Sequence, residues 1–187
     1  PVLAALWALY LSLSHAGQVF LGFQWDTLLT ETLFVSLAVA RWWPGAPDEP
    51  PLLGVLALRL LLFKLMFGSG LAKLASGDPT WWDGSALAYH YWTQPLPNPL
   101  SWWFDRAPAA WHALETWATL GIELLLPFAI AFGRPGRAIA AGGFALVLAL
   151  LMISGNYGFF QLLSLVLVLS LLDDALLAKL TAGRLRI

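Results

Sequence analysis

The sequence predicts an all-α fold, a polytopic bundle of transmembrane helices with about five or six membrane spans. Of its 187 residues, 59% are hydrophobic and only 11% are charged, whereas a soluble domain carries about 25% charged residues. The chain also contains eleven tryptophans, and membrane–water interfaces are where such rings collect. Several apolar stretches approach the length of about 20 residues that a helix needs to cross the hydrocarbon layer. These observations together exclude a soluble globular protein.

Charge and residue types exclude several functional classes. A net charge of −1 argues against nucleic-acid binding, which needs a basic stripe. The chain has no cysteine, so it can form no disulfide, thiolate metal site or cysteine nucleophile. The three histidines, at positions 15, 90 and 112, do not have the spacing of metal ligands. Phosphate loops and nucleophile elbows are also absent from the sequence. We therefore predict no metal and no cofactor, and membrane lipids as partners.

Six apolar stretches are candidate membrane spans, and polar residues separate them: 1–23, 27–43, 52–75, 111–132, 138–154 and 159–172. The prolines of 44–51 predict a loop, and residues 133–137 (GRPGR) predict a tight basic turn. The last stretch has only 14 residues, so residues 155–172 fit either a full span or a re-entrant hairpin around 155–158. Because the chain opens at Pro1 inside an apolar run, we expect residues 1–187 to be one transmembrane domain from the interior of a longer protein.

The distribution of Lys and Arg predicts which ends of the spans face the cytoplasm. If residues 133–137 are cytoplasmic, only Arg106 of the basic residues between the spans lies on the opposite side. Such asymmetry follows the positive-inside rule, so the long segment 76–110 is expected to be exoplasmic. The basic residues on the cytoplasmic side would be Arg41, Arg134, Arg137, Lys179, Arg184 and Arg186.

Ionisable residues within the third and fourth stretches need an explanation, because charge in a membrane is costly. At 100° per residue, Arg59, Gly70 and Lys73 lie on one side of the third helix. On the fourth helix, His112, Thr116, Thr119 and Glu123 also share a side. We expect the two charged stripes to meet, because pairing offsets much of the desolvation. The pairs could be structural, or Lys73 could border a reactive pocket as a base, with Glu123 and His90 or His112 tuning protonation.

Segment 76–110 is rich in aromatic residues and proline. Its tryptophans, together with Trp111, suit a belt at the level of the lipid headgroups. Pro95, Pro97 and Pro99 predict a rigid extended segment around Asn98. His90 is its one histidine, and a lone histidine is more often structural than catalytic. Our candidate catalytic residues are Lys73, His90 and Glu123, and our candidate binding residues are Arg59, Trp81, Trp82, Tyr89, Gln94, Asn98, His112 and Asn156.

Four blocks of the chain closely resemble the lipase maturation factor family, in order and in spacing. They are residues 17–31, 61–103 (including YHYWTQPLPNP), 122–128 and 154–174 (SGNYGFF through LLDD). The resemblance implies a polytopic membrane protein with a further C-terminal region. It also implies a role in helping secreted lipases reach an active fold, with a lipase as a possible client. Animal members lie in the endoplasmic reticulum membrane, whereas the absence of cysteine and the Ala/Gly/Trp-rich composition favour a bacterial inner membrane here.

A shorter block, residues 68–87, also resembles vitamin K-dependent gamma-carboxylase. Lys73, followed by Leu74, stands where that enzyme has the lysine that acts as a base on the quinol. The resemblance implies an alternative function, a membrane enzyme acting on a quinone-like or lipid substrate, although shared ancestry does not transfer chemistry by itself. A third reading is a structural helix subunit of a larger membrane complex. We favour the maturation factor over both alternatives.

Overall fold

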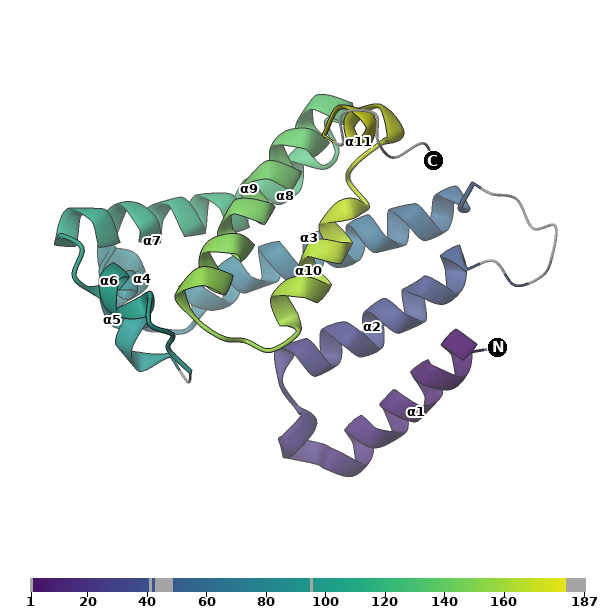
Figure 1. The fold of residues 1–187 in the computed structure, drawn as a ribbon, viewed down its shortest axis with the longest axis horizontal. Helices are drawn as coiled ribbons and strands as arrows, with labels where there is room; N and C mark the ends of the chain where they lie inside the picture. Colours follow the sequence, from purple (N-terminus) through teal and green to yellow (C-terminus); the bar gives the residue numbers. More distant parts are fainter. Residues whose placement is uncertain (1, 41, 43–48, 95, 181–187) are drawn as a thin grey trace. The chain divides into compact units, whose positions relative to one another are not determined.

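A computed structural model describes residues 2–40, 42, 49–94 and 96–180, with the side chains of 178–180 left aside. All the regular elements in these ranges are helices, as predicted (Figure 1). Several residues used above, namely Arg41, Pro95, Arg184, Arg186 and most of the 44–51 loop, lie outside the described residues, as does the side chain of Lys179. Within the described ranges the helices are α1 (Val2–Gly17), η1 (Gln18–Leu21), α2 (Gln24–Val39), α3 (Leu52–Ala75), α4 (Thr80–Asp83), α5 (Ala86–Thr93), α6 (Ser101–Asp105), α7 (Ala109–Leu124), α8 (Leu126–Ala129), α9 (Gly133–Ser154), α10 (Phe160–Leu169) and α11 (Asp174–Leu180).

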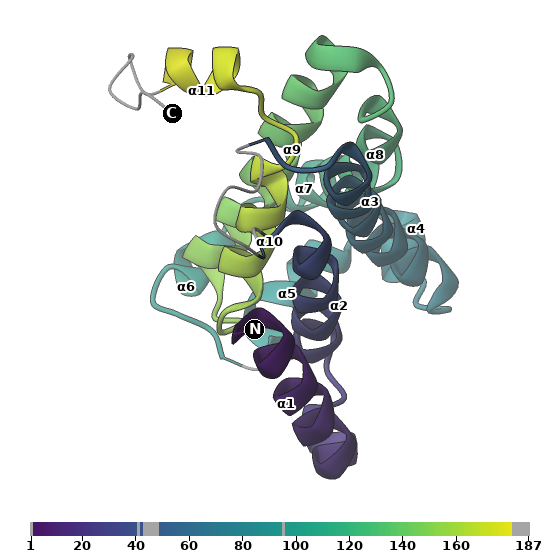
Figure 2. The same cartoon turned by 90° about the vertical axis from the view of Figure 1, so that its right-hand side faces the viewer.

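The chain divides into two compact units, residues 1–62 and 63–187. In the first unit, α1 and α2 lie side by side, joined by η1 (Figures 1 and 2). The hydroxyl of Tyr10 on α1 donates to Oδ1 of Asp26 on α2 at 2.6 Å, and Asp26 is only 3% exposed. Four apolar side chains of α1, those of Val2, Leu6, Leu9 and Leu13, are exposed. Polar groups inside and apolar groups outside are what a helix pair in lipid requires.

In the second unit, α9 and α10 lie side by side (Figure 1), and α7 and α8 pack on α9. Phe144 of α9 and Leu167 of α10 are among the most buried side chains. The tight turn predicted at residues 133–137 is wrong, because these residues form the first turn of α9. Pro135 is tolerated there because the first turn of a helix needs no internal N–H partner. Gly133 begins the helix with φ +67°, a conformation that favours glycine.

Three helical segments in the described part of the chain are long and apolar enough to cross a membrane: Val2–Leu21, Leu52–Ala75 and Gly133–Ser154. They match the predicted stretches 1–23, 52–75 and 138–154. Helix α7 is shorter, but it also turns polar side chains inward, with His112, Thr116 and Glu123 buried and Trp117 half exposed. The total of five or six spans stays a prediction.

The path of residues 155–172 bears on whether they form a hairpin or a full span. After α10 the chain makes a short turn, and Oδ2 of Asp173 lies 2.7 Å from Nε of Arg134 in the first turn of α9. The segment that leaves the end of α9 at Ser154 has therefore returned to the end where α9 begins. Helix α10 itself has only 10 residues, so the choice between a full span and a re-entrant hairpin around 155–158 stays a prediction.

Candidate functional site

The buried polar centre of the second unit is an ion pair between α3 and α7. The ammonium of Lys73 donates to both carboxylate oxygens of Glu123, at 2.8 and 2.7 Å. The Lys73 side chain is 24% exposed and that of Glu123 only 6%. A Cβ built on Gly70, one turn before Lys73, would lie 2.9 Å from the side chain of Leu124. The small residue therefore lets the two helices approach closely, and the predicted meeting of the cationic and acidic stripes is confirmed for this pair.

Two aromatic side chains of the short-helix connector, residues 76–110, lie near the ion pair. The ammonium of Lys73 is 5.4 Å from the ring centroid of Trp81 on α4, within the range of a cation–π interaction. His90 on α5 is largely buried, and its Nε2 has no hydrogen-bond partner among the described residues. Burial lowers the pKa of His90 below its ordinary value of 6.5, and the positive charge of Lys73 adds to the effect. His90 is therefore neutral at physiological pH.

The second polar cluster ties the connector to the end of α9. Gln94 Nε2 donates to the backbone oxygen of Ser154 at 2.7 Å and lies 3.1 Å from Oγ of Ser101. The amide of Asn98 donates to the oxygen of Ile153 at 2.9 Å. The hydroxyl of Ser101 also donates to Ser154 O. Carbonyls in the last turn of a helix lack internal partners, so these three side chains cap α9. We call Gln94, Asn98 and Ser101 the neutral clamp.

The third cluster joins α5 and α6 to the N-terminal half of α7. The hydroxyl of Tyr91 donates to Glu115 at 2.9 Å, and burial together with this bond raises the pKa of Tyr91 above its ordinary range. Nδ1 of His112 lies 3.6 Å from the same carboxylate, and its Nε2 is 3.3 Å from Asp105 O. His112 is 4% exposed. The cluster holds the short helices against α7 through buried groups.

The structure gathers some of the predicted site residues and separates others. Lys73, Glu123 and Trp81 lie together, with His90 beside them. Gln94 and Asn98 belong to the neutral clamp, and the backbone N–H of the nearby Asn156 donates to Leu96 O at 3.1 Å. His112 lies in the third cluster, whereas Trp82 and Tyr89 are exposed. Arg59 is half-buried in the first unit. The roles of these residues in catalysis or binding stay predictions.

Sequence reasoning missed Ser101, Ser154 and Tyr91, all of which carry buried hydrogen bonds. One signal could have found the first of them. Asn followed by Pro favours a side-chain turn over the next residues, and Ser101 lies two positions after Pro99. Oδ1 of Asn98 indeed accepts from Leu100 N at 2.9 Å and from Ser101 N at 3.2 Å. Ser154 and Tyr91 had no such local signal, because their partners lie more than 20 residues away in the chain.

The chemistry of the ion pair follows from its geometry. An ammonium has three N–H donors, and those of Lys73 face two carboxylate oxygens and, at 3.5 Å, the oxygen of Ser69. A lysine that acts as a base needs a nitrogen lone pair directed at its substrate, whereas Nζ of Lys73 is directed at the two carboxylate oxygens of Glu123. Among the described residues, no group of three His, Asp or Glu could hold a metal ion. The arrangement is suited to locking two helices in register.

Inward polar clusters, outward apolar surfaces and long apolar helices define this chain as an integral membrane protein domain of α-helices. The sequence profile of the lipase maturation factor transmembrane domain matches residues 1–179, and the chain belongs to that family. No solved structure matches it.

Curated relatives extend the comparison. The chain is 45% identical over 183 residues to lipase maturation factor 2 of Rattus norvegicus and 43% identical over 188 residues to the Homo sapiens protein of that name. These alignments cover 90% and 92% of the chain but 26% of each relative. Lipase maturation factor 1 of Mus musculus is 37% identical over 180 residues, covering 94% of the chain and 31% of that protein. The chain thus spans between a quarter and a third of the relatives' length.

Proposed function

We propose that this chain is the membrane domain of a maturation factor for exported lipases. The observation that carries the proposal is the membership of nearly the whole chain in the lipase maturation factor family, whose relatives bear that name. The geometry of the second unit supports an anchoring and presenting role. The connector contacts Lys73 of α3 through Trp81, α7 through the third cluster and α9 through the neutral clamp, and in this proposal it serves as a platform at one end of these helices.

In this proposal the platform lies on the exoplasmic side, where an exported lipase folds. The asymmetry of basic residues supports that side. The absence of cysteine and the composition support a bacterial inner membrane, and the endoplasmic reticulum membrane would be the location in a eukaryote. The client is a secreted lipase that contacts the platform or the parts of the full-length protein beyond this domain.

The test is lipase maturation by the full-length protein in cells that lack it. A secreted lipase is co-expressed, and its activity is divided by the amount of exported lipase protein. Gln94→Ala removes the central side chain of the neutral clamp and should lower that ratio while the protein still enters the membrane. Thr93→Ala is the matched control, because Thr93 is exposed and, within the described part of the chain, its hydroxyl donates just to Tyr89 O of its own helix. A lipase equally active with and without the full-length protein would overturn the proposal.

A charge swap separates an anchoring ion pair from a lysine base. Lys73→Glu and Glu123→Lys each place two like charges at the α3–α7 contact and should abolish maturation. The double variant restores opposite charges with the two side chains exchanged, so an anchoring pair predicts recovery of lipase activity. A lysine base would not recover, because the amine would then sit on α7 instead of α3. Failure of the double variant, despite normal insertion, would favour an enzymatic role for Lys73.

A further inference from the structure

The connector is built with its polar groups inward and its rings outward. On α5, the buried side includes Tyr91, and the helix ends at the buried Gln94, both hydrogen-bonded, whereas Tyr89 and Trp92 are 49% and 62% exposed. On α6, Ser101 is 2% exposed, whereas the next residue but one, Trp103, is 67% exposed. A segment surrounded by water has the opposite arrangement, with apolar side chains inside.

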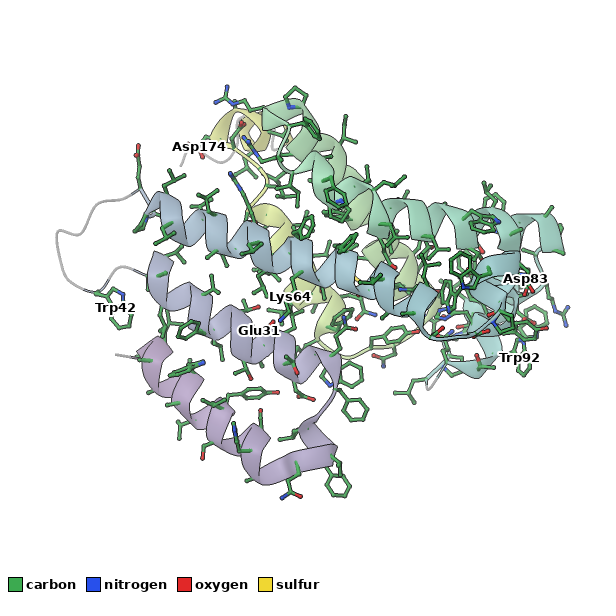
Figure 3. All side chains as sticks on the ribbon, turned by 180° about the vertical axis from the view of Figure 1, so that it is seen from behind. Glu31, Trp42, Lys64, Asp83, Trp92 and Asp174 are labelled. Atoms are coloured by element: carbon green, nitrogen blue, oxygen red, sulfur yellow. The ribbon has the colours of Figure 1, made fainter. Side chains whose placement is uncertain are left out.

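The outward rings occur as two pairs, one on α5 and one on α6, rather than as single exposed residues. The rings of Tyr89 and Trp92 have centroids 6.0 Å apart, and those of Trp102 and Trp103 are 4.7 Å apart. The guanidinium of Arg106 lies 3.5 Å from the Trp102 ring centroid, so one positive charge stacks on the face of this ring. Figure 3 shows Trp92 at the outer edge of the short helices, in the same region as Asp83. We call Tyr89, Trp92, Trp102 and Trp103 the ring surface.

The level of the ring surface relative to a bilayer follows from its attachments. The connector begins directly after α3, one of the membrane-crossing segments, and Trp81 contacts Lys73 in the last turn of that helix. The neutral clamp binds the carbonyls at the end of α9, the other long apolar helix of this unit. The connector therefore lies where two spans end, which is the depth of the lipid headgroups.

The charged residues of the connector indicate which kind of lipid headgroup contacts the ring surface. The connector carries three carboxylates, of Asp78, Asp83 and Asp105, against the single guanidinium of Arg106. Hydrogen bonds from Ser85 lower the pKa of Asp83, so that carboxylate is ionised. A weakly acidic, tryptophan-rich surface fits the dipolar headgroups of zwitterionic lipids, where amphipathic rings are most favourable. An acidic polymer or an anionic lipid would be repelled.

We infer that the connector is an interfacial element, whose ring surface inserts into the headgroup layer of zwitterionic lipid and fixes the platform against the membrane. The inference goes beyond the proposed lipase role and does not depend on it. The rings are then a membrane contact, and a client would have to use other parts of the platform. An apolar segment of the client is the competing occupant of the same surface.

Residues 1–187 contain no cysteine, so a single cysteine introduced among them can be spin-labelled in the full-length protein once any cysteines outside residues 1–187 have been replaced by serine. The protein is placed in phosphatidylcholine nanodiscs, without any lipase, and each label is probed by collision with oxygen and with a water-soluble nickel chelate. Trp92→Cys and Trp103→Cys report the ring surface. Glu49→Cys, in an exposed polar segment, is the water reference, and Leu146→Cys, 54% exposed in the middle of α9, is the lipid reference.

If the rings are interfacial, nickel collisions at both tryptophan positions should be lower than at Glu49 by about threefold or more, and oxygen collisions should approach those at Leu146. Tyr89→Cys and Leu100→Cys probe the same region through smaller side chains if either tryptophan variant fails to fold. Nickel access equal to that at Glu49 would overturn the inference. Protection that appears only after a lipase is added would also overturn it and assign the ring surface to the client. Lipase maturation is a separate readout, so the proposed function can stand or fall independently.

Discussion

The ion pair of Lys73 and Glu123 and the neutral clamp both join distant parts of the second unit, but they do so by different physics. The ion pair joins two charges at 2.7 Å in a largely dry setting between α3 and α7. The clamp uses uncharged side chains to satisfy the carbonyls at the end of α9. Removing one partner of a buried ion pair leaves an uncompensated charge, whereas removing one clamp residue leaves a dipole unsatisfied. The ion pair is therefore the more fragile connection to single substitutions.

The largest effect is expected when one charge of the ion pair is removed. Lys73→Met or Glu123→Gln should lower the free energy of unfolding by about 3–5 kcal/mol, because the remaining charged group stays buried alone. The double variant Lys73→Met with Glu123→Leu should recover most of this loss, since an apolar pair needs no desolvation of charge. Thermal unfolding in detergent measures all three. A single variant as stable as the unchanged protein would show that water already solvates the pair.

The clamp can be broken sterically without changing any of its residues. A Cβ added at Gly155 would meet the amide oxygen of Gln94 and the ring of Tyr157, so Gly155→Ala should cost about 1–3 kcal/mol by overpacking. The backbone of Gly155 is extended and adopts no left-handed conformation, so the effect is steric. Gly142→Ala is the control, because nothing lies within 4 Å of its added Cβ. In a thermal melt we expect the control to be as stable as the unchanged protein or more so, and equal melting of both variants would contradict the clamp geometry.

The two connections also differ in how far the sequence could predict them. Charged residues inside apolar stretches are rare because they are costly in a membrane. The side of α3 that carries Lys73 and the side of α7 that carries Glu123 could therefore be found from helical geometry alone. Gln94 was a candidate binding residue, but its role as a cap of α9 was not predicted, because the clamp depends on Ser101 in the connector and Ser154 in α9 being brought together in space. The long helix of residues 52–75 could also be predicted, from the length of its apolar stretch. The start of α9 could not be predicted, because GRPGR has turn-like composition yet satisfies the rules for a first helical turn.

His90 provides a smaller, pH-dependent way to examine the surroundings of the ion pair. Because the pKa of His90 is lowered in the folded protein, the unfolded chain binds a proton at this residue more tightly than the folded chain does. This contribution to stability is present above the ordinary pKa of 6.5 and is lost as the pH falls below it. His90→Gln should therefore flatten the loss of stability between about pH 7.5 and about pH 5.5. Thermal melts at the two pH values measure the slope, and an unchanged slope in the variant would show that His90 accepts a proton freely in the folded state.

The smallest effect is expected at the exposed ion pair of Arg134 and Asp173, which is the surface counterpart of the buried one. Arg134 is 74% exposed, so water and salt screen its bond to Asp173 although the distance is the same 2.7 Å. Arg134→Ala should cost about 0–1 kcal/mol, and less at high salt. Asp173→Ala should cost more than Arg134→Ala, because Oδ1 of Asp173 also accepts from Leu176 N at 3.0 Å and caps α11. If unfolding in detergent shows equal losses for Arg134→Ala and Lys73→Met, distance rather than burial would govern the strength of these pairs.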